Sequence, residues 1–302
     1  MPAHVSKHVK VHKKCRKTYG VRLRGYCFEL NLSHPSAQGF NFDSLCYLQD
    51  FYSRVNNDAA MHIVLFYLPS IAYRVPYVKT MLDVGSGPTV HMPMIFRKKV
   101  EEVYLSDYAE NNINILQHWW KGQSVFDWTE VTKYVAQLEG NPEEWNEMEQ
   151  RARELVKGVY QCDVYREGVI KDVERSKEGF DLVTTFFCIE ASGITSEDYW
   201  KAVKNVIKLI KVGGYLVMGG IQEDHWYCFA GRRFECHYLT EKELFAALTY
   251  CGVDTREGNY RYYLNDGVFL FFGQKISKMG KRKKKDSVQL TQSTEDGSTT
   301  GS

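Results

Sequence analysis

MLDVGSGPT, residues 81–89, is the stretch that decides the fold. It completes an apolar β-type run, residues 78–84, and continues into a Gly-x-Gly turn. Gly85 and Gly87 have no Cβ, so the backbone of this turn can approach a ligand closely. Pro88 suits the first turn of a helix, where its missing N–H costs nothing. The stretch therefore predicts a strand, a turn and a following helix whose free N–H groups attract a carboxylate or a phosphate.

Two acidic residues follow at the ends of later apolar runs. Asp107 comes 24 residues after Asp83 and directly follows the run 100–106. An acid at this place can accept hydrogen bonds from both hydroxyls of a ribose. Asp163 follows the short run 159–162, where its carboxylate can accept from an adenine amino group while an apolar neighbour packs on the ring. A turn, a helix and two acids in this order predict a nucleoside-containing cofactor.

Two classes of cofactor use such a turn. Dinucleotide-binding oxidoreductases carry Gly-x-Gly-x-x-Gly, and Val90 occupies the third glycine position here. The form Asp-x-Gly-x-Gly, with Asp83 first, favours S-adenosylmethionine. A nicotinamide-dinucleotide oxidoreductase therefore remains only as the less favoured class of enzyme.

Strand and helix signals alternate through the body of the chain. Further apolar β-type runs lie at 180–188, 215–218 and 267–273. Helical patterns lie at 43–56, 58–73, 90–97, 109–121, 142–157, 195–210 and 240–251. This alternation predicts a single α/β domain of the Rossmann-like kind, with a mostly parallel sheet covered by helices on both faces.

The charges are unevenly distributed. Residues 1–28 carry eight Lys or Arg and no acid, and residues 278–285 carry six and no acid. The remaining body, with 25 basic and 34 acidic residues, is acidic. An acidic body disfavours nucleic acid as a partner and suits a small cationic ligand. The segments 1–40 and 277–302 are expected to be disordered tails.

Two motifs in the tails have alternative interpretations. The KRKKK run, residues 281–285, is either a solvated tail or a nuclear signal. His4, His8 and His12 would share one helix face and could bind a metal, but a flexible tail is favoured, and no metal site is predicted.

The cysteines and the apolar segments indicate a cytosolic protein. The eight cysteines form no CxxC pair, which is typical of reduced thiols in a reducing compartment. The N-terminus has no apolar signal core. The longest apolar stretch, residues 61–75, is interrupted and too short to span a bilayer. We expect a cytoplasmic monomer without a membrane span.

Residues 41–276 resemble the methyltransferase family that includes nicotinamide, phenylethanolamine and indolethylamine N-methyltransferase. Besides the motifs above, the resemblance rests on FDW (126–128), LEGN (138–141), FCIEA (187–191) and GGYL (213–216). It implies a seven-stranded Rossmann-like sheet with an N-terminal helical lid and S-adenosyl-L-methionine as cofactor. It also implies transfer of a methyl group to the nitrogen of a small molecule.

The resemblance also implies a set of cofactor-binding residues. Two tyrosines before the glycine turn match residues placed over the methionine part of the cofactor. His91 stands where the nicotinamide enzyme has a tyrosine, which leaves the contact of that hydroxyl open. The implied cofactor-binding residues are Tyr47, Tyr52, Gly85, Ser86, Gly87, Thr89, Asp107, Tyr108, Asn112, Asp163 and Val164.

On the acceptor side, the resemblance points to three residues. Glu190 follows the run 180–188 and matches an acid that faces the substrate amine, although it is also explained as a charge at a helix N-terminus. Asp224 matches a second such acid, although a polar loop also explains it. Tyr227 matches a tyrosine of the substrate wall. Carboxylates near an amine can hold the cation and relay its proton.

One departure bears on the identity of the acceptor. Gly220 occupies the place of an aspartate that holds the carboxamide in the nicotinamide enzyme. We therefore expect an aromatic or alkyl amine as acceptor, with Glu190 and Asp224 binding it. The alternatives are a nicotinamide or pyridine N-methyltransferase, and a catalytically inactive S-adenosylmethionine-binding protein.

Overall fold

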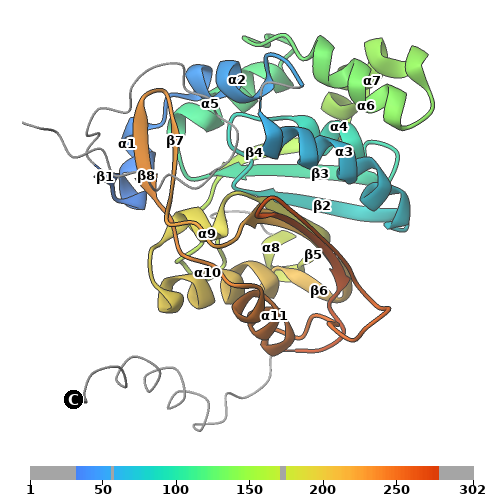
Figure 1. Cartoon of the computed structure of the whole chain (residues 1–302). Coiled ribbons are helices and arrows are strands. Elements are labelled where there is room, and N and C mark those ends of the chain that lie inside the picture. The colour runs from blue at the N-terminus through green and yellow to red at the C-terminus, as the bar shows by residue number, and fades with distance from the viewer. Residues whose placement is uncertain (1–31, 56–57, 171–174, 279–302) are drawn as a thin grey trace, which may run out of the picture.

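The computed structural model describes residues 32–55, 58–170 and 175–278. Its main element is a seven-stranded sheet in the order β4-β3-β2-β5-β6-β10-β9 (Figure 1). Neighbouring strands are parallel from β4 to β6, whereas β10 is antiparallel to β6 and β9. These strands are β2 (Val78–Val84), β3 (Val100–Asp107), β4 (Val156–Gln161), β5 (Phe180–Phe186), β6 (Ile210–Ile221), β9 (Arg261–Asn265) and β10 (Val268–Gln274). The predicted mostly parallel α/β fold is confirmed.

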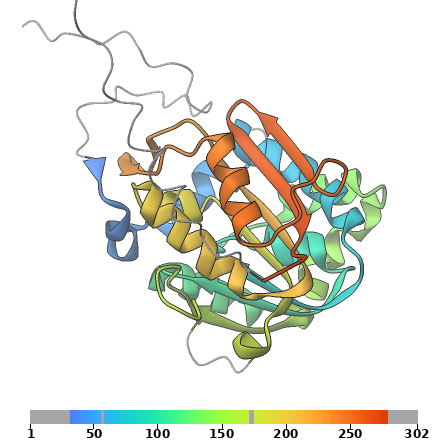
Figure 2. The same cartoon turned by 90° about the horizontal axis from the view of Figure 1, so that it is seen from below.

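Helices cover both faces of this sheet, as Figures 1 and 2 show. One apolar cluster contains residues of α3 (Ala59–Arg74), α4 (His91–Phe96), α5 (Glu110–Trp120), α6 (Thr129–Leu138) and α7 (Trp145–Leu155). The other contains residues of α10 (Ser196–Lys208) and α11 (Glu241–Tyr250). Met81 belongs to the first cluster and Leu82 to the second, because successive strand residues point to opposite faces. A sheet buried on both faces explains the nearly continuous apolar runs of the sequence.

A smaller sheet and a group of short helices lie beyond the carboxyl ends of the parallel strands. β1 (Leu32–Ser33), β8 (Arg232–Glu235) and β7 (Trp226–Phe229) form the small sheet, in that order. The short helices before β2 are η1 (Pro35–Ala37), α1 (Gln38–Asn41) and α2 (Ser44–Tyr52). Figure 1 shows β1 and α1 beside the β7–β8 hairpin. The structure also contains η2 (Pro142–Glu144), α8 (Arg175–Glu178) and α9 (Ile189–Ser192).

The helix predicted over 90–97 is confirmed to within one residue at each end, but Pro88 does not lie in its first turn. α4 starts at His91, so Pro88 lies in the turn and not in the first turn of a helix. The reason is the backbone of the turn, since Gly85 and Gly87 both have positive φ, +69° and +61°, which a helix does not accommodate. The proline that lies in the first helical turn is Pro93, where a missing N–H leaves no bond unmade.

Two other boundaries differ from the prediction. The helix expected over 142–157 ends at Leu155, and the strand expected at 159–162 starts earlier, at Val156. By local pattern alone, Val156 fits either the end of a helix or the start of a strand. It is apolar and buried in the sheet, so its tertiary position decides for the strand. The sequence analysis also did not identify α6 or the β7–β8 hairpin.

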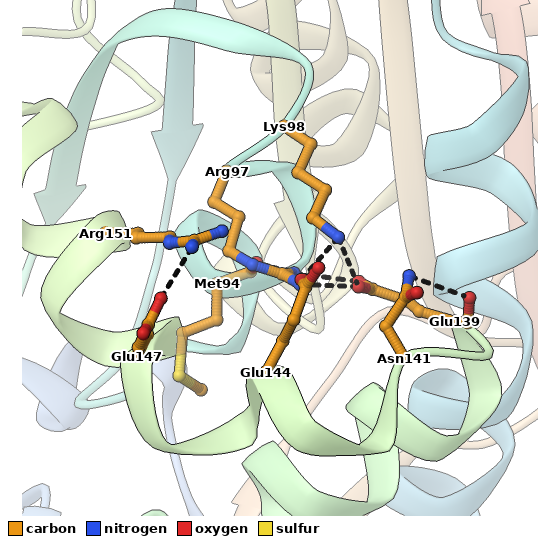
Figure 3. Close-up of polar contacts among 8 residues, drawn as sticks. All are labelled: Met94, Arg97, Lys98, Glu139, Asn141, Glu144, Glu147 and Arg151. Carbon is orange, nitrogen blue, oxygen red and sulfur yellow. Dashed lines mark hydrogen bonds and ion pairs between the residues drawn. The ribbon is translucent and has the colours of Figure 1, made fainter.

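The LEGN motif has a structural role in joining α4 to the loop after α6 (Figure 3). The guanidinium of Arg97 is almost fully buried, and its Nη1 donates to Glu139 Oε1 at 2.8 Å and to the Met94 carbonyl at 2.8 Å. Glu144 also pairs with Arg97, at 3.2 Å, and with Lys98. These charged hydrogen bonds hold α4, and thereby the end of the glycine turn, against α6.

The FDW motif supports the same side of the molecule. Phe126 and Trp128 are buried with ring centroids 4.9 Å apart, and Asp127 accepts from the Thr129 N–H at the start of α6. Trp128 packs on Tyr52, with ring centroids 5.5 Å apart.

Within the described residues, no helix combines the length and apolar content that a membrane crossing requires.

Candidate active site

A cavity of about 830 Å³ opens at the carboxyl ends of β2, β3, β4 and β5. Its volume is in the range of small-molecule sites. Ligands bind at this edge of open α/β sheets, where loops from several strands converge. Of the residues predicted for the cofactor or the acceptor, all but Asp224 line this cavity: Tyr47, Tyr52, Gly85, Ser86, Gly87, Thr89, Asp107, Tyr108, Asn112, Asp163, Val164, Glu190 and Tyr227.

The glycine turn forms the floor of the cavity. A Cβ placed on Gly85 would lie 2.6 Å from the Cβ of Cys188, which leaves no space for a side chain there. The N–H of Gly87 donates to Asp107 Oδ2 at 2.7 Å. Gly85 is therefore needed because the turn packs closely on the end of β5, and Asp107 holds the turn in place.

Asp107 is the centre of a hydrogen-bond network. Its Oδ1 accepts from the Ala109 N–H at 2.9 Å and from Asn112 Nδ2 at 3.0 Å. Asn112 Oδ1 accepts in turn from the Ser44 hydroxyl at 2.6 Å. Burial raises the pKa of Asp107, and these donors oppose the rise. The network fixes the carboxylate at the cavity wall and joins α2 to α5.

The residues after β4 form another part of the wall. Asp163 Oδ1 accepts from the Tyr165 N–H at 2.9 Å, and its Oδ2 pairs with the exposed Arg166 at 3.2 Å. Val164 is buried, and its carbonyl accepts from Asn205 at 2.9 Å. This is a polar atom beside an apolar side chain, as the sequence predicted for an adenine pocket.

Aromatic side chains cover the opposite side of the cavity. Tyr47 and Tyr52, both on α2, have ring centroids 6.2 Å apart. Tyr52 stacks on His91 at 5.4 Å, with 26° between the ring planes. His91 is fully buried, and desolvation lowers its pKa to about 3, so its imidazole is neutral. A neutral imidazole offers one donor and one acceptor to a ligand.

Several buried polar atoms on the cavity wall have no partner within the described residues. They are Asp58 Oδ2, Asp83 Oδ2, both ring nitrogens of His91 and Glu190 Oε2. Buried polar groups almost always have hydrogen-bond partners, so unpartnered ones around a cavity indicate a polar ligand. Carboxylates suit a cationic ligand, and S-adenosylmethionine carries both a sulfonium and an ammonium group. The residues present therefore fit this cofactor.

Asp83 shows how strongly this wall favours positive charge. It is buried at the end of β2, and Thr184 Oγ1 donates to its Oδ1 at 2.6 Å. Desolvation, opposed by hydrogen bonds from Thr184 and Ser86, raises its pKa to about 6. A cation bound next to it would restore the ionised form.

Glu190 lies on α9, directly after β5, where the sequence analysis placed it. Only 2% of the residue is exposed. Its Oε1 accepts from the Ile221 N–H at 3.0 Å, while its backbone carbonyl accepts from the His237 N–H at 2.8 Å. Desolvation, only partly offset by hydrogen bonds from the N–H groups of Glu190 itself and of Ile221, raises its pKa to about 7. Near neutral pH this carboxyl can therefore both hold and release a proton.

Asp224 and Tyr227 differ in their relation to the cavity. Tyr227, on β7, lines it and stacks on Phe234 at 5.4 Å. Asp224 is half-buried in the turn before β7 and is not on the cavity wall, where Cys236 lies instead. Desolvation is the main cause that raises the pKa of the Cys236 thiol, and the negative charges of Glu190 and Asp224 raise it further. Asp224 therefore lies behind Cys236 and does not line the cavity.

The segment 34–38, which the sequence analysis assigned to a disordered tail, also lines the cavity. Gln38 Nε2 donates to the Ala191 carbonyl at 2.9 Å, which joins α1 to α9. The described structure thus begins at Leu32, before the predicted boundary at residue 41. This segment has few apolar residues and packs against distant elements, so no local pattern marked it. The motifs at His4, His8 and His12 and at 281–285 lie outside the described residues.

Other cavity residues were also missed. Asp58 caps α3 by accepting from the Met61 N–H at 2.9 Å, and only its position in space brings it to the cavity. Phe187 has a positive φ of +49°, which is unusual for an aromatic residue and marks the sharp turn between β5 and α9. The sequence carries no signal for this backbone conformation.

This fold and this site together define an S-adenosylmethionine-dependent methyltransferase. The model of the NNMT/PNMT/TEMT family matches residues 34–276. The chain is 35% identical over 244 residues to nicotinamide N-methyltransferase of Caenorhabditis elegans, covering 78% of this chain and 89% of that protein. It is 28% identical over 208 residues to phenylethanolamine N-methyltransferase of Macaca mulatta, covering 66% and 74%.

The chain belongs to the NNMT/PNMT/TEMT family. It is an S-adenosylmethionine-dependent N-methyltransferase that acts on small molecules, as the sequence analysis expected. Among solved structures, the cyclase SpnF superposes with a TM-score of 0.50 at 12% identity, covering 83% of this chain and 99% of that one. At this identity the likeness shows the fold alone.

Proposed function

We propose that the enzyme methylates the nitrogen of a small aromatic or alkyl amine, and that Glu190 receives this amine. The observation that carries the proposal is the unpartnered Glu190 Oε2, buried at the cavity wall. An isolated buried carboxylate is costly unless a cation or a proton accompanies it. The ammonium group of an amine would supply both the positive charge and a proton.

Cofactor binding would rest on the opposite part of the cavity. Asp107 and Asp163 would hold the nucleoside, while Tyr47, Tyr52 and His91 would enclose the methionine end. When bound, S-adenosylmethionine supplies a methyl group on an electrophilic sulfonium. Holding the amine and the donor in one closed cavity makes the transfer effectively unimolecular.

Glu190 would also manage the proton of the amine. An alkylamine enters mostly as an ammonium and must lose a proton before its lone pair can attack. With a pKa raised to about 7, Glu190 can take that proton near neutral pH. Asp224 would add negative potential behind Cys236 without touching the amine. Tyr227 would form the apolar wall for the rest of the acceptor.

A pyridine nitrogen is the second candidate acceptor. It is favoured by the 35% identity to a protein named nicotinamide N-methyltransferase. A neutral pyridine has no proton to remove, however, and would leave the buried carboxylate without a cation. The acceptor test below separates the two.

The test compares alkylamines, aromatic amines and pyridines as acceptors with the purified full-length chain. Glu190→Gln should lower kcat/KM for amines by roughly 30-fold or more, the usual effect of removing one partner of a buried charged contact. Asp224→Asn should lower it less, and exposed Glu223→Gln should leave it unchanged. Calorimetry with S-adenosylhomocysteine should give equal affinities for all four proteins. Amine turnover that is unchanged in Glu190→Gln contradicts the proposal.

We further propose that the protein acts in the cytoplasm as a monomer. Among the described residues, the six cysteines are free thiols, as in a reducing compartment. Fractionation of cells and analytical ultracentrifugation of the purified chain test these two statements. A dimer at micromolar concentration contradicts the second.

A further inference from the structure

Gly220, on β6, lies directly beside the Glu190 carboxyl group, and the function proposed above makes no use of this close approach. A Cβ built on Gly220 would lie 2.7 Å from both Cδ and Oε2 of Glu190. The three heavy atoms nearest to that Cβ all belong to the Glu190 carboxyl group. A Cβ closer than 3.0 Å to another group makes one of them shift, and the far end of a flexible side chain, such as the Glu190 carboxyl group, shifts more easily than backbone. Any side chain at position 220 therefore has to displace the carboxylate.

The backbone does not require glycine at this position. Gly220 lies within β6 and pairs with Phe269 of β10 in regular antiparallel register. It is not among the residues with positive φ, unlike Gly85 and Gly87. An alanine or a larger residue would fit the strand conformation. The close approach of Glu190 is thus the feature of the structure that explains a glycine here.

The end of β6 leaves space for the Glu190 carboxyl group and also donates a hydrogen bond to it. Ile221, the next residue, donates its N–H to Glu190 Oε1 at 3.0 Å. Gly220 lies beyond the last residue pair of β6 with β5, Gly219 with Phe186, so the strand edge there faces α9 instead of a neighbouring strand. The carboxyl group fills the place beside this strand edge, and its Oε2 is buried without a hydrogen-bond partner among the described residues.

We propose that Gly220 is a specificity-determining residue that selects cationic amine acceptors. Because it has no side chain, it leaves space for the Glu190 carboxyl group against the strand, at a position where Glu190 lines the cavity. A side chain at position 220 moves that group away and leaves a wall suited to neutral acceptors. This inference rests on the proposed function, because it takes Glu190 as the group that receives the amine.

A stability cycle tests the steric part without any substrate. The melting temperature is measured for the full-length chain, Gly220→Ala, Glu190→Ala and the double variant. Gly220→Ala should lower the melting temperature by a few degrees, because the displaced Glu190 carboxyl group loses its hydrogen bond from the Ile221 N–H. In the Glu190→Ala background the same change should have almost no effect. An equal loss in both backgrounds means that Gly220 serves the strand itself, which overturns the proposal.

A kinetic cycle tests the selection of the acceptor. Gly220→Ala should lower kcat/KM for the best amine by roughly 30-fold, as loss of the Glu190 contact does. It should leave the affinity for S-adenosylhomocysteine unchanged, which also shows that the variant is folded. In a Glu190→Gln background, Gly220→Ala should cause no further loss of amine turnover. A further loss of the same size there refutes the assignment.

The two cycles separate this inference from the proposed function. If amines are methylated and the stability cycle shows no coupling, the inference about Gly220 fails and the proposed function stands. If the stability cycle shows coupling but only neutral acceptors are methylated, the proposed function is wrong. The role of Gly220 in amine selection then fails with it.

Discussion

Replacing Glu190 by glutamine should stabilise the protein in a manner that depends on pH. Burial raises the pKa of Glu190 to about 7 from its usual value of 4.5. Between these values the folded state holds a proton that the unfolded state releases. The stability from this proton is fully present below about pH 4.5 and is lost as the pH rises through about 7.

The size of the effect follows from the two pKa values. They differ by about 2.5, and a difference of one corresponds to ~1.36 kcal/mol, which together amount to about 3 kcal/mol. Glutamine keeps the shape of the side chain but does not ionise. The free energy of unfolding of Glu190→Gln, taken relative to the wild type, should therefore rise by about 3 kcal/mol as the pH increases from about 4.5 to about 8.

Urea unfolding followed by tryptophan fluorescence measures this gain at several pH values without ligand. Glu257→Gln, at an exposed loop position, controls for the loss of one carboxylate. The comparison with wild type at each pH removes the titration of the other acids, Asp83 included. Parallel curves for the wild type and Glu190→Gln across the whole range would refute the assignment of a costly buried charge at this site.

Four further substitutions test other parts of the structure. Gly85→Ala should reduce the affinity for S-adenosylhomocysteine at least tenfold in calorimetry, because its Cβ would meet Cys188. Gly87→Ala has space for its Cβ, so it should cost only the about 1–2 kcal/mol of stability that a left-handed backbone imposes on alanine. Arg97→Met leaves Glu139 with only the longer contact to Lys98 at 3.8 Å (Figure 3) and should lower the free energy of unfolding in urea by about 3 kcal/mol. An unchanged midpoint would show that the pair of Arg97 and Glu139 is unimportant. Lys275→Met removes the donor to two carbonyls at the end of α10 and should cost about 1–3 kcal/mol in the same assay, with cofactor affinity intact.

The sequence alone determined the sheet and which residues after its strands would meet at one cavity. The apolar run before Gly85 is continuous because β2 is buried on both faces, and local composition is enough to recognise such a strand. Asp107 and Asp163 follow the ends of neighbouring parallel strands, and these ends necessarily meet at one edge of the sheet. Residues whose roles depend on strand order were therefore correctly brought together at one cavity.

The sequence named Glu190 and Tyr227 for the acceptor, but only the tertiary structure decided how the residues around them are arranged. The contact between Glu190 and Gly220 joins residues on different elements, and neither has a local pattern that signals it. Segment 34–38 and Asp58 reach the cavity through packing against distant elements, while Asp224 remains behind its wall. Periodicity and motif spacing record which face of an element is buried, but they contain no information on how far a side chain reaches across a cavity. That distance is set by the packing of the whole domain.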